Sequence, residues 1–158
     1  MSIEVNHILF PTDFSDLALV ALRHARRFAE VFNAQLHCLH VVDEAYQYWS
    51  AMGPESVPVG PPMEDLLQLA RQRMEQFSAE HLGEIKPEPI TEVVLGRPFA
   101  QIVAYAEERK MDLIVMGTHG RGAITHMFLG STTEKVIRKS PCAVLTVRPS
   151  DHDFDVDM

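Results

Sequence analysis

Residues 113–136, LIVMGTHGRGAITHMFLGSTTEKV, indicate most clearly how this chain folds. An apolar run from Leu113 to Met116 has the length of a buried strand, and four glycines follow it between residues 117 and 130. Ser131-Thr132-Thr133-Glu134 then has the composition of a helix start. A strand, a glycine-bearing loop and a helix in succession are typical of proteins built on a parallel sheet.

The same alternation of strands and helices runs through the rest of the chain. The expected strands are residues 5–10, 36–42, 90–95, 112–116 and 142–147. The expected helices are residues 17–32, with Ser15 or Asp16 as the cap, 63–82, 99–106 and 131–139. This succession predicts an α/β fold, a parallel sheet with helices on both faces. Right-handed crossovers leave two strand orders open, 2-1-3-4-5 and 3-2-1-4-5, and in both of them ligands bind beyond the carboxyl ends of the strands.

Length and composition are those of one globular domain. The chain has 158 residues, of which 46% are hydrophobic and 23% charged, and we expect residues 1–150 to form a single domain. Residues 43–62 contain four prolines and two glycines and are expected to form a long loop. Residues 151–158 contain an aspartate at every second position, and we expect them to be a disordered acidic tail.

Charge and cysteine content exclude several classes of function. A net charge of −8 is unsuited to broad nucleic-acid binding, which depends on lysine and arginine, but it permits a local anion site built from backbone N–H groups. No apolar run approaches the roughly 20 residues that span a bilayer, and the N-terminus has no export signal. Cys38 and Cys142 are expected to be buried thiols within strands. We therefore expect a cytoplasmic protein that binds neither nucleic acid nor membrane.

The glycine-bearing loop offers a specific way to bind phosphate. Gly117, Gly120 and Gly130 follow the spacing G-x2-G-x9-G, and Ser131 and Glu134 are spaced as a capping box with Ser131 at the N-cap. The first N–H groups of a helix lack partners inside the helix and carry the positive end of its dipole. They can therefore donate directed hydrogen bonds to phosphate oxygens.

This loop differs from the better-known phosphate loops. No Gly-Lys-Ser/Thr sequence follows, as a Walker A loop requires, and no third glycine completes the dinucleotide motif. Glycines at a strand end also serve as ordinary turn residues. Glu134 would place a carboxylate near the phosphates unless it faces the cap or a divalent cation intervenes. From the loop alone, phosphate binding and a purely structural turn both remain open.

Taken together, the motifs resemble those of the universal stress protein family, in particular its ATP-binding branch. The resemblance covers residues 6–148 and rests on ILFPTDFS at the first strand, LHVVD at the second, and DLIVMGTHGRG with LGSTTEKVIRKSPCAVLTVR at the end. It implies a three-layer α/β/α sandwich, similar to the adenine nucleotide alpha hydrolase-like fold, whose five parallel strands lie in the order 3-2-1-4-5. It also implies that ATP lies across strands one and four.

The resemblance further implies which residues surround the nucleotide. Those near adenine and ribose would be Pro11, Thr12, Asp13, Val41 and Met116. Those around the ribose and phosphates would be Gly117, Thr118, His119, Gly120, Arg121 and Gly122. Those closing on the phosphates would be Gly130, Ser131, Thr132 and Thr133. Mg²⁺ would be held through the phosphates and not by protein side chains.

The other titratable residues indicate no catalytic or metal centre. His37 and His40 are three apart on a strand, so their side chains face opposite sides of the sheet and cannot easily share a metal ion. No second carboxylate beside Asp13, and no Ser-His-Asp or Cys-His set, indicates a catalytic base. We therefore expect that the protein is not an efficient enzyme, which leaves slow ATP hydrolysis open.

The fifth strand, Cys142 to Val147, would be an apolar sheet edge without protecting proline or lysine. A two-fold homodimer would cover it, and the family resemblance points the same way. The leading hypothesis is that bound ATP biases conformation or assembly, which an unidentified protein partner then reads. The alternative is a nucleotide-independent dimeric interaction module of the same fold. A third hypothesis, an ATP-using enzyme, has no supporting residues in the sequence.

Overall fold

The strands pair in parallel in the order β3-β2-β1-β4-β5, in a computed structural model that describes residues 2–45, 61–118 and 129–149. They are β1 (His7–Pro11), β2 (Gln35–Asp43), β3 (Ile90–Gly96), β4 (Leu113–Gly117) and β5 (Ala143–Val147). Of the two orders that the sequence left open, 3-2-1-4-5 is the one observed. β2 and β3 follow β1 on one side of it, whereas β4 and β5 lie on its other side. The strand order therefore reverses between β1 and β4.

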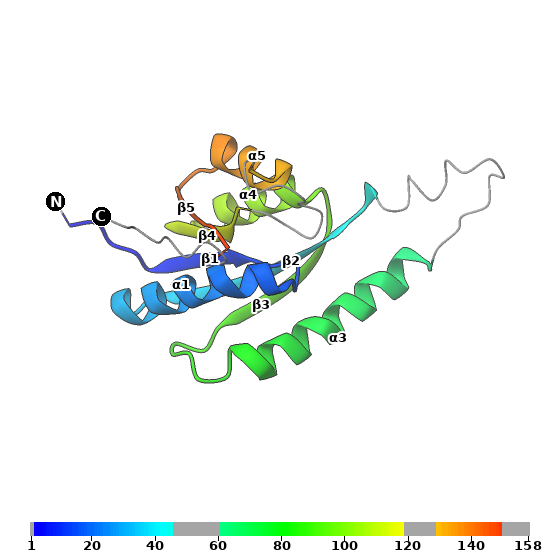
Figure 1. Ribbon diagram of the computed structural model, residues 1–158, viewed down its shortest axis with the longest axis horizontal. Coiled ribbons are helices and arrows are strands. Elements are labelled where there is room, and N and C mark those ends of the chain that lie inside the picture. Colours follow the sequence, from blue (N-terminus) through cyan, green and yellow to red (C-terminus); the bar gives the residue numbers. More distant parts are fainter. Residues whose placement is uncertain (1, 46–60, 119–128, 150–158) are drawn as a thin grey trace, which may run out of the picture.

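Helices cover both faces of this sheet, as the alternation predicted. They are α1 (Asp16–Phe32), α3 (Met63–His81), α4 (Pro98–Glu108) and α5 (Ser131–Lys139). Figure 1 shows α1 and α3 on one side of the sheet and α4 and α5 on the other. Alternate residues of β1 serve the two sides, since Ile8 packs with α1 and α3 whereas Leu9 packs with α4 and α5. The three-layer α/β/α sandwich is therefore confirmed.

Helix α1 begins and ends where its sequence provides caps. The hydroxyl of Ser15 accepts a hydrogen bond from the backbone N–H of Ala18 at 3.3 Å. At the other end Asn33 adopts the left-handed conformation, with φ of 52°, and its N–H donates to carbonyl groups of the last turn. Of the two caps that the sequence offered, Ser15 is the one used, and Asp16 is the first helical residue.

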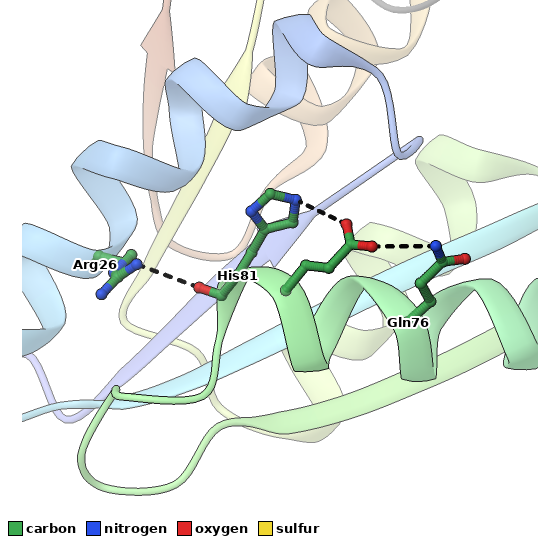
Figure 2. Close-up of polar contacts among 4 residues, drawn as sticks. Arg26, Gln76 and His81 are labelled. Carbon is green, nitrogen blue, oxygen red and sulfur yellow. Dashed lines mark hydrogen bonds and ion pairs between the residues drawn. The ribbon is translucent and has the colours of Figure 1, made fainter.

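Helix α3 lies on the sheet through a narrow buried row and is tied to α1 at its C-terminal end. Its buried residues are Ala70, Met74 and Phe77. The guanidinium of Arg26 in α1 donates to the backbone carbonyl of His81 at 3.3 Å (Figure 2). Beside this contact, the Gln76 amide donates to the Glu80 carboxylate at 3.1 Å. Among the helices that the structure describes, none is long and apolar enough to cross a bilayer.

Differences from the sequence prediction are small and concern the ends of elements. β1 and β2 each extend one residue beyond the predicted end, to Pro11 and Asp43. Most of the predicted loop at 43–62 and the whole predicted tail at 151–158 lie outside the described residues, so these two predictions are not tested.

The prediction that both cysteines are buried within strands was wrong for one of them. Cys38 is buried in β2, as expected, and neither cysteine forms a disulfide. Cys142 is only half-buried and precedes β5, which begins at Ala143. The reason is a turn at the end of α5, where the N–H of Cys142 donates to the hydroxyl of Ser140 at 3.2 Å.

The two histidines of β2 lie on opposite faces of the sheet, as predicted. His37 is buried, and its Nδ1 atom is hydrogen-bonded to the hydroxyl of Tyr105 in α4 at 2.9 Å. His40 lies on the side of α1 and α3, with its ring 4.3 Å from the ring of Phe14. Each histidine therefore belongs to the packing between the sheet and a different helical layer.

Candidate functional site

A cavity of about 390 Å³ opens at the carboxyl ends of β1 and β4, where the strand order reverses. Its volume is within the range of small-molecule sites, roughly 300–1,000 Å³. Strands β1, β2 and β4 and helices α1, α4 and α5 all contribute to its walls. The lining residues are Pro11, Thr12, Asp13, Ala18, Leu39, His40, Val41, Asp43, Pro98, Ile102, Met116, Gly117, Thr132 and Thr133.

Residues predicted from the sequence gather at this cavity. Those that line it are Pro11, Thr12, Asp13, Val41, Met116, Gly117, Thr132 and Thr133. Thr118, Gly130 and Ser131 adjoin it in the chain, and the N–H of Gly130 donates to the carbonyl of Thr118 at 2.8 Å. His119, Gly120, Arg121 and Gly122 lie outside the described residues, so the contacts predicted for them stay predictions.

The turn from β1 into α1 holds a carboxylate at the cavity. Thr12 is buried, and its hydroxyl accepts a hydrogen bond from the N–H of Phe14 at 3.0 Å. The carboxylate of Asp13 accepts hydrogen bonds from the N–H of Ser15, at 3.0 Å, and from the Ser15 hydroxyl. Phe14 has a φ of 62°, the left-handed conformation that closes this turn. Local hydrogen bonds therefore fix the direction of the Asp13 side chain.

His40 connects this turn to β2. Its Nδ1 atom lies 2.7 Å from the backbone carbonyl of Thr12. Because a carbonyl only accepts hydrogen bonds, Nδ1 carries the proton and donates it. The ring also packs against Phe14 and lines the cavity. One side of the cavity is thus braced from the neighbouring strand.

Strand β2 runs past the end of β1 and turns part of its backbone towards the cavity. Its pairing with β1 ends at Leu39, opposite Pro11, whereas its pairing with β3 continues to Asp43. The carbonyl of Leu39 accepts a hydrogen bond from the N–H of Thr12 at 2.8 Å, so it points to the side of β1. Alternate residues of a strand direct their N–H and C=O groups to the same side. The backbone groups of Val41 therefore face the space beyond the end of β1.

The N-terminus of α5 faces the cavity, and its N-cap residue has no side chain that could act as a cap. The N-cap is Gly130, with φ of −58° and ψ of 149°, and it makes no side-chain cap hydrogen bond. The prediction that Ser131 is the N-cap was therefore wrong, because Ser131 is the first helical residue. A capping side chain would accept from the second or third helical N–H, and those belong to Thr132 and Thr133, which both line the cavity. Gly130 therefore leaves these N–H groups without an N-cap side chain.

Two further contacts orient this end of α5. The hydroxyl of Thr133 donates to the backbone carbonyl of Gly117 at 2.9 Å, which joins the helix to the end of β4. The carboxylate of Glu134 lies 2.9 Å from the guanidinium of Arg138, one turn further along the helix. A capping box would need Glu134 to reach back to the N-cap, and this ion pair directs it the other way. Its negative charge is therefore drawn away from the cavity.

The sequence did not identify several lining residues: Ala18, Leu39, His40, Asp43, Pro98 and Ile102. Pro98 and Ile102 belong to the first turns of α4, and together with Val41 and Met116 they give the cavity apolar walls. In the described parts of the chain, no group of three or more His, Cys, Asp or Glu side chains could hold a metal ion. An apolar slot that ends at the N-terminus of a helix can hold a flat ring linked to an anionic group.

Gly96 sets the position of the α4 wall, because it connects β3 to the residue before Pro98. Its φ is 152°, and a Cβ atom there would lie 2.7 Å from Nε2 of Gln101. An L side chain is strained in this conformation, so we expect Gly96→Ala to lower the free energy of unfolding by about 2 kcal/mol and Tm by about 6 °C. Chemical denaturation and differential scanning calorimetry measure these two quantities.

Gly83→Ala is the matched control for this substitution, since a Cβ at Gly83 would meet the Ala79 carbonyl oxygen at 3.9 Å, an ordinary contact. The double variant Gly96→Ala/Gln101→Ala removes the close side-chain contact but not the positive φ, so most of the loss should persist. Unchanged stability of Gly96→Ala would contradict the assigned role of this glycine.

Comparisons with known proteins give one consistent result. The model of the universal stress protein family matches residues 4–148. Universal stress protein MJ0531 of Methanocaldococcus jannaschii is 35% identical over 148 residues, which cover 89% of this chain and 81% of the relative. Universal stress protein MJ0577 of the same organism is 32% identical over 159 residues, which cover 94% of this chain and 98% of the relative.

Solved structures share the fold over nearly the whole chain. The structure of MJ0577 has a TM-score of 0.78 and 33% sequence identity, covering 93% of this chain and 98% of that chain. A crystal structure of a universal stress protein in complex with cAMP has a TM-score of 0.59 and 26% identity, covering 92% of this chain and 98% of that chain.

Proposed function

The chain belongs to the universal stress protein family, and from this premise we propose that it binds ATP in the cavity at the carboxyl ends of β1 and β4. The observation that carries the proposal is the N-terminus of α5, where the N-cap is a glycine and therefore has no side chain to cap the first N–H groups. This helix end adjoins a cavity with apolar walls, a combination that suits phosphates joined to a purine. The relative that was crystallised with cAMP supports an adenine nucleotide as the class of ligand.

The arrangement of the cavity indicates how ATP would lie. The phosphates would accept hydrogen bonds from the N–H groups of Thr132 and Thr133, at the positive end of the α5 dipole. The adenine would lie against Val41, whose backbone groups face the space beyond β1. Asp13, in the turn that follows β1, lies between these two ends and would accept hydrogen bonds from the ribose hydroxyls.

Mg²⁺ would enter this site bound to the phosphates. In the described part of the chain, the side chains that α5 contributes to the cavity are threonines, and the carboxylate of Asp13 is already engaged with Ser15. Magnesium is commonly held by phosphate oxygens and water with few protein ligands. The ion would neutralise part of the phosphate charge, which also suits a protein whose net charge is −8.

We propose that the protein uses ATP as a signal and not as a fuel. Among the described residues two carboxylates line the cavity, but Asp13 is hydrogen-bonded within its own turn, and Asp43 lies at the β2 end, away from α5. Neither is placed to activate a water molecule at the phosphates. Turnover should therefore stay near the background rate of hydrolysis, and release of phosphate at a rate of several per second would contradict this part of the proposal.

The bound nucleotide would act by biasing conformation or assembly, which a protein partner then reads. In the described chain β5 pairs with β4 on one side, which leaves its other edge for a two-fold dimer. ATP would contact β1, β2 and α5. Its binding would therefore affect the position of the elements that lie next to β5. Sedimentation velocity with and without ATP measures whether assembly depends on the nucleotide, and a dimer indifferent to ATP would favour a nucleotide-independent interaction module.

Equilibrium dialysis with ATP and Mg²⁺ is the direct test of binding. We expect one ATP per chain to be retained at ligand concentrations in the micromolar to millimolar range. Native mass spectrometry of the purified protein would detect a nucleotide carried over from cells. Failure to bind any adenine nucleotide at millimolar concentration would overturn the proposed function.

A further inference from the structure

We propose that Asp43 determines which purine the site accepts, because its carboxylate accepts a hydrogen bond from the 6-amino group of adenine and rejects a 6-oxo group. This inference rests on the proposed ATP site and deepens it. Sequence reasoning treated Asp43 as the first residue of a loop, whereas the structure places it at the end of β2 and in the cavity wall.

The direction of the ligand follows from the order of the strands. The cavity runs across the carboxyl edge of the sheet from α5, beside β4, to β2 and the start of α4. If the phosphates occupy the N-terminus of α5, the base must lie at the opposite end, next to β2. The lining residues from β2 and α4 are Leu39, His40, Val41, Asp43, Pro98 and Ile102. The apolar members of this set form the faces of a slot, and Asp43 is the one carboxylate among them.

Asp43 lies on the same side of β2 as Val41, since the two residues are two positions apart on an extended strand. A base held edge-on by the backbone of Val41 therefore presents its neighbouring substituent towards Asp43. An ionised carboxylate only accepts hydrogen bonds. It would pair with the N–H of an amino group, and it would repel the oxygen of an oxo group.

A local hydrogen bond holds this carboxylate in place. Its Oδ1 atom accepts from the N–H of Ala45 at 2.9 Å, which closes a short turn after β2. This hydrogen bond orients the carboxylate. A carboxylate can accept several hydrogen bonds, so it can still accept one from a ligand. The turn alone would explain an aspartate or an asparagine at this position. The cavity lining is what points to a ligand, and these two explanations make different predictions.

Asp43→Asn separates them, because asparagine keeps an Oδ1 acceptor for Ala45 and replaces the second oxygen with an NH₂ donor. The probes are ATP and inosine triphosphate, in which an oxo group replaces the 6-amino group. For the wild-type protein we expect isothermal titration calorimetry to give about tenfold tighter binding of ATP, a discrimination kept modest by the exposure of Asp43 to solvent. In Asp43→Asn the preference should fall to about twofold or reverse, since the new donor suits the oxo group.

Glu44→Gln is the matched control. It removes one negative charge from the adjacent residue, whose carboxylate lies 3.8 Å from the guanidinium of Arg97, and it should leave the ratio of the two affinities unchanged. Thermal unfolding of Asp43→Asn shows whether the turn is preserved. If the wild-type protein binds ATP but Asp43→Asn keeps the same discrimination, the role of Asp43 is overturned while the ATP site stands. If the wild-type protein binds neither nucleotide, the proposed function itself fails, and this inference falls with it.

Discussion

Replacing Gly130 by valine is expected to weaken ATP binding by about 100-fold or more. An N-cap side chain lies over the second and third N–H groups of its helix, which here belong to Thr132 and Thr133. A branched side chain at this position would stand where the phosphates are to accept their hydrogen bonds. Loss of two hydrogen bonds to a charged group amounts to about 3 kcal/mol or more, which corresponds to at least the stated loss in affinity.

The valine variant should fold, because the φ of −58° and ψ of 149° at Gly130 are open to any residue. Adenosine provides a ligand control, since it lacks phosphates and should bind the variant and the wild-type protein equally weakly. Isothermal titration calorimetry with ATP and adenosine measures both. If Gly130→Val bound ATP as tightly as the wild-type protein, the phosphates could not lie at the N-terminus of α5.

Acidification is expected to destabilise the protein through His37. Burial lowers the pKa of His37 from 6.5 to about 4, and the nearby His7 and Arg109 add to this effect. In the unfolded chain the imidazole is protonated below its ordinary pKa of 6.5, whereas in the folded protein it stays neutral down to about 4. The unfolded state therefore binds more protons in this window, and stability falls as the pH falls.

This contribution is complete above pH 6.5 and is lost progressively between pH 6.5 and pH 4. The shift in pKa corresponds to about 3 kcal/mol of unfolding free energy. Urea denaturation at pH 7, 6, 5 and 4 compares the wild-type protein with His37→Gln. The variant should lose about 3 kcal/mol less than the wild-type protein over this range, once the carboxylates common to both have been subtracted.

His24→Gln is the control for this experiment, since His24 is an exposed histidine on α1. Its pH profile should follow that of the wild-type protein. Equal losses of stability in the wild-type protein and His37→Gln would show that His37 is not held neutral by the fold. The burial of His37 beside Tyr105, to whose hydroxyl its Nδ1 atom is hydrogen-bonded, would then not control the protonation of the imidazole.

The sequence correctly predicted that two segments would meet at one edge of the sheet, because each ends a strand with recognisable turn residues. Pro11, Thr12 and Asp13 end an apolar strand with turn residues, and Gly117 ends another, so both segments were expected at one sheet edge. The structure places them at the same cavity. Pattern alone left two strand orders open, because both satisfy right-handed crossovers, and the resemblance to the family chose between them.

The lining residues that were not predicted from the sequence belong to the cavity only because of how the helices and strands pack together. Pro98 and Ile102 look like ordinary helix-start and core residues, and only the placement of α4 over the end of β2 makes them a cavity wall. Asp43 was assigned to a loop, but pairing with Gly96 extends β2 to include it.

The helix cap was misassigned for a related reason. Glycine and serine are both accepted at an N-cap, so the local sequence fits two alignments of the cap. In the observed alignment Gly130 is the N-cap, and the Thr133 hydroxyl donates to the carbonyl of Gly117. This hydrogen bond joins two segments that are distant in the sequence, so local sequence patterns do not predict it.

Titration of isotope-labelled protein with ATP and Mg²⁺, followed by two-dimensional ¹⁵N–¹H NMR, shows directly whether the N-terminal amides of α5 bind the phosphates of a nucleotide whose base lies against β2. We expect ATP to cause large chemical-shift changes for the amides of Thr132, Thr133 and Val41. Adenosine should change the shift of Val41 but leave those of the two threonines nearly unchanged. If saturating ATP left the chemical shifts of the α5 amides unchanged, or changed only those of residues remote from the cavity, this placement of the nucleotide would be contradicted.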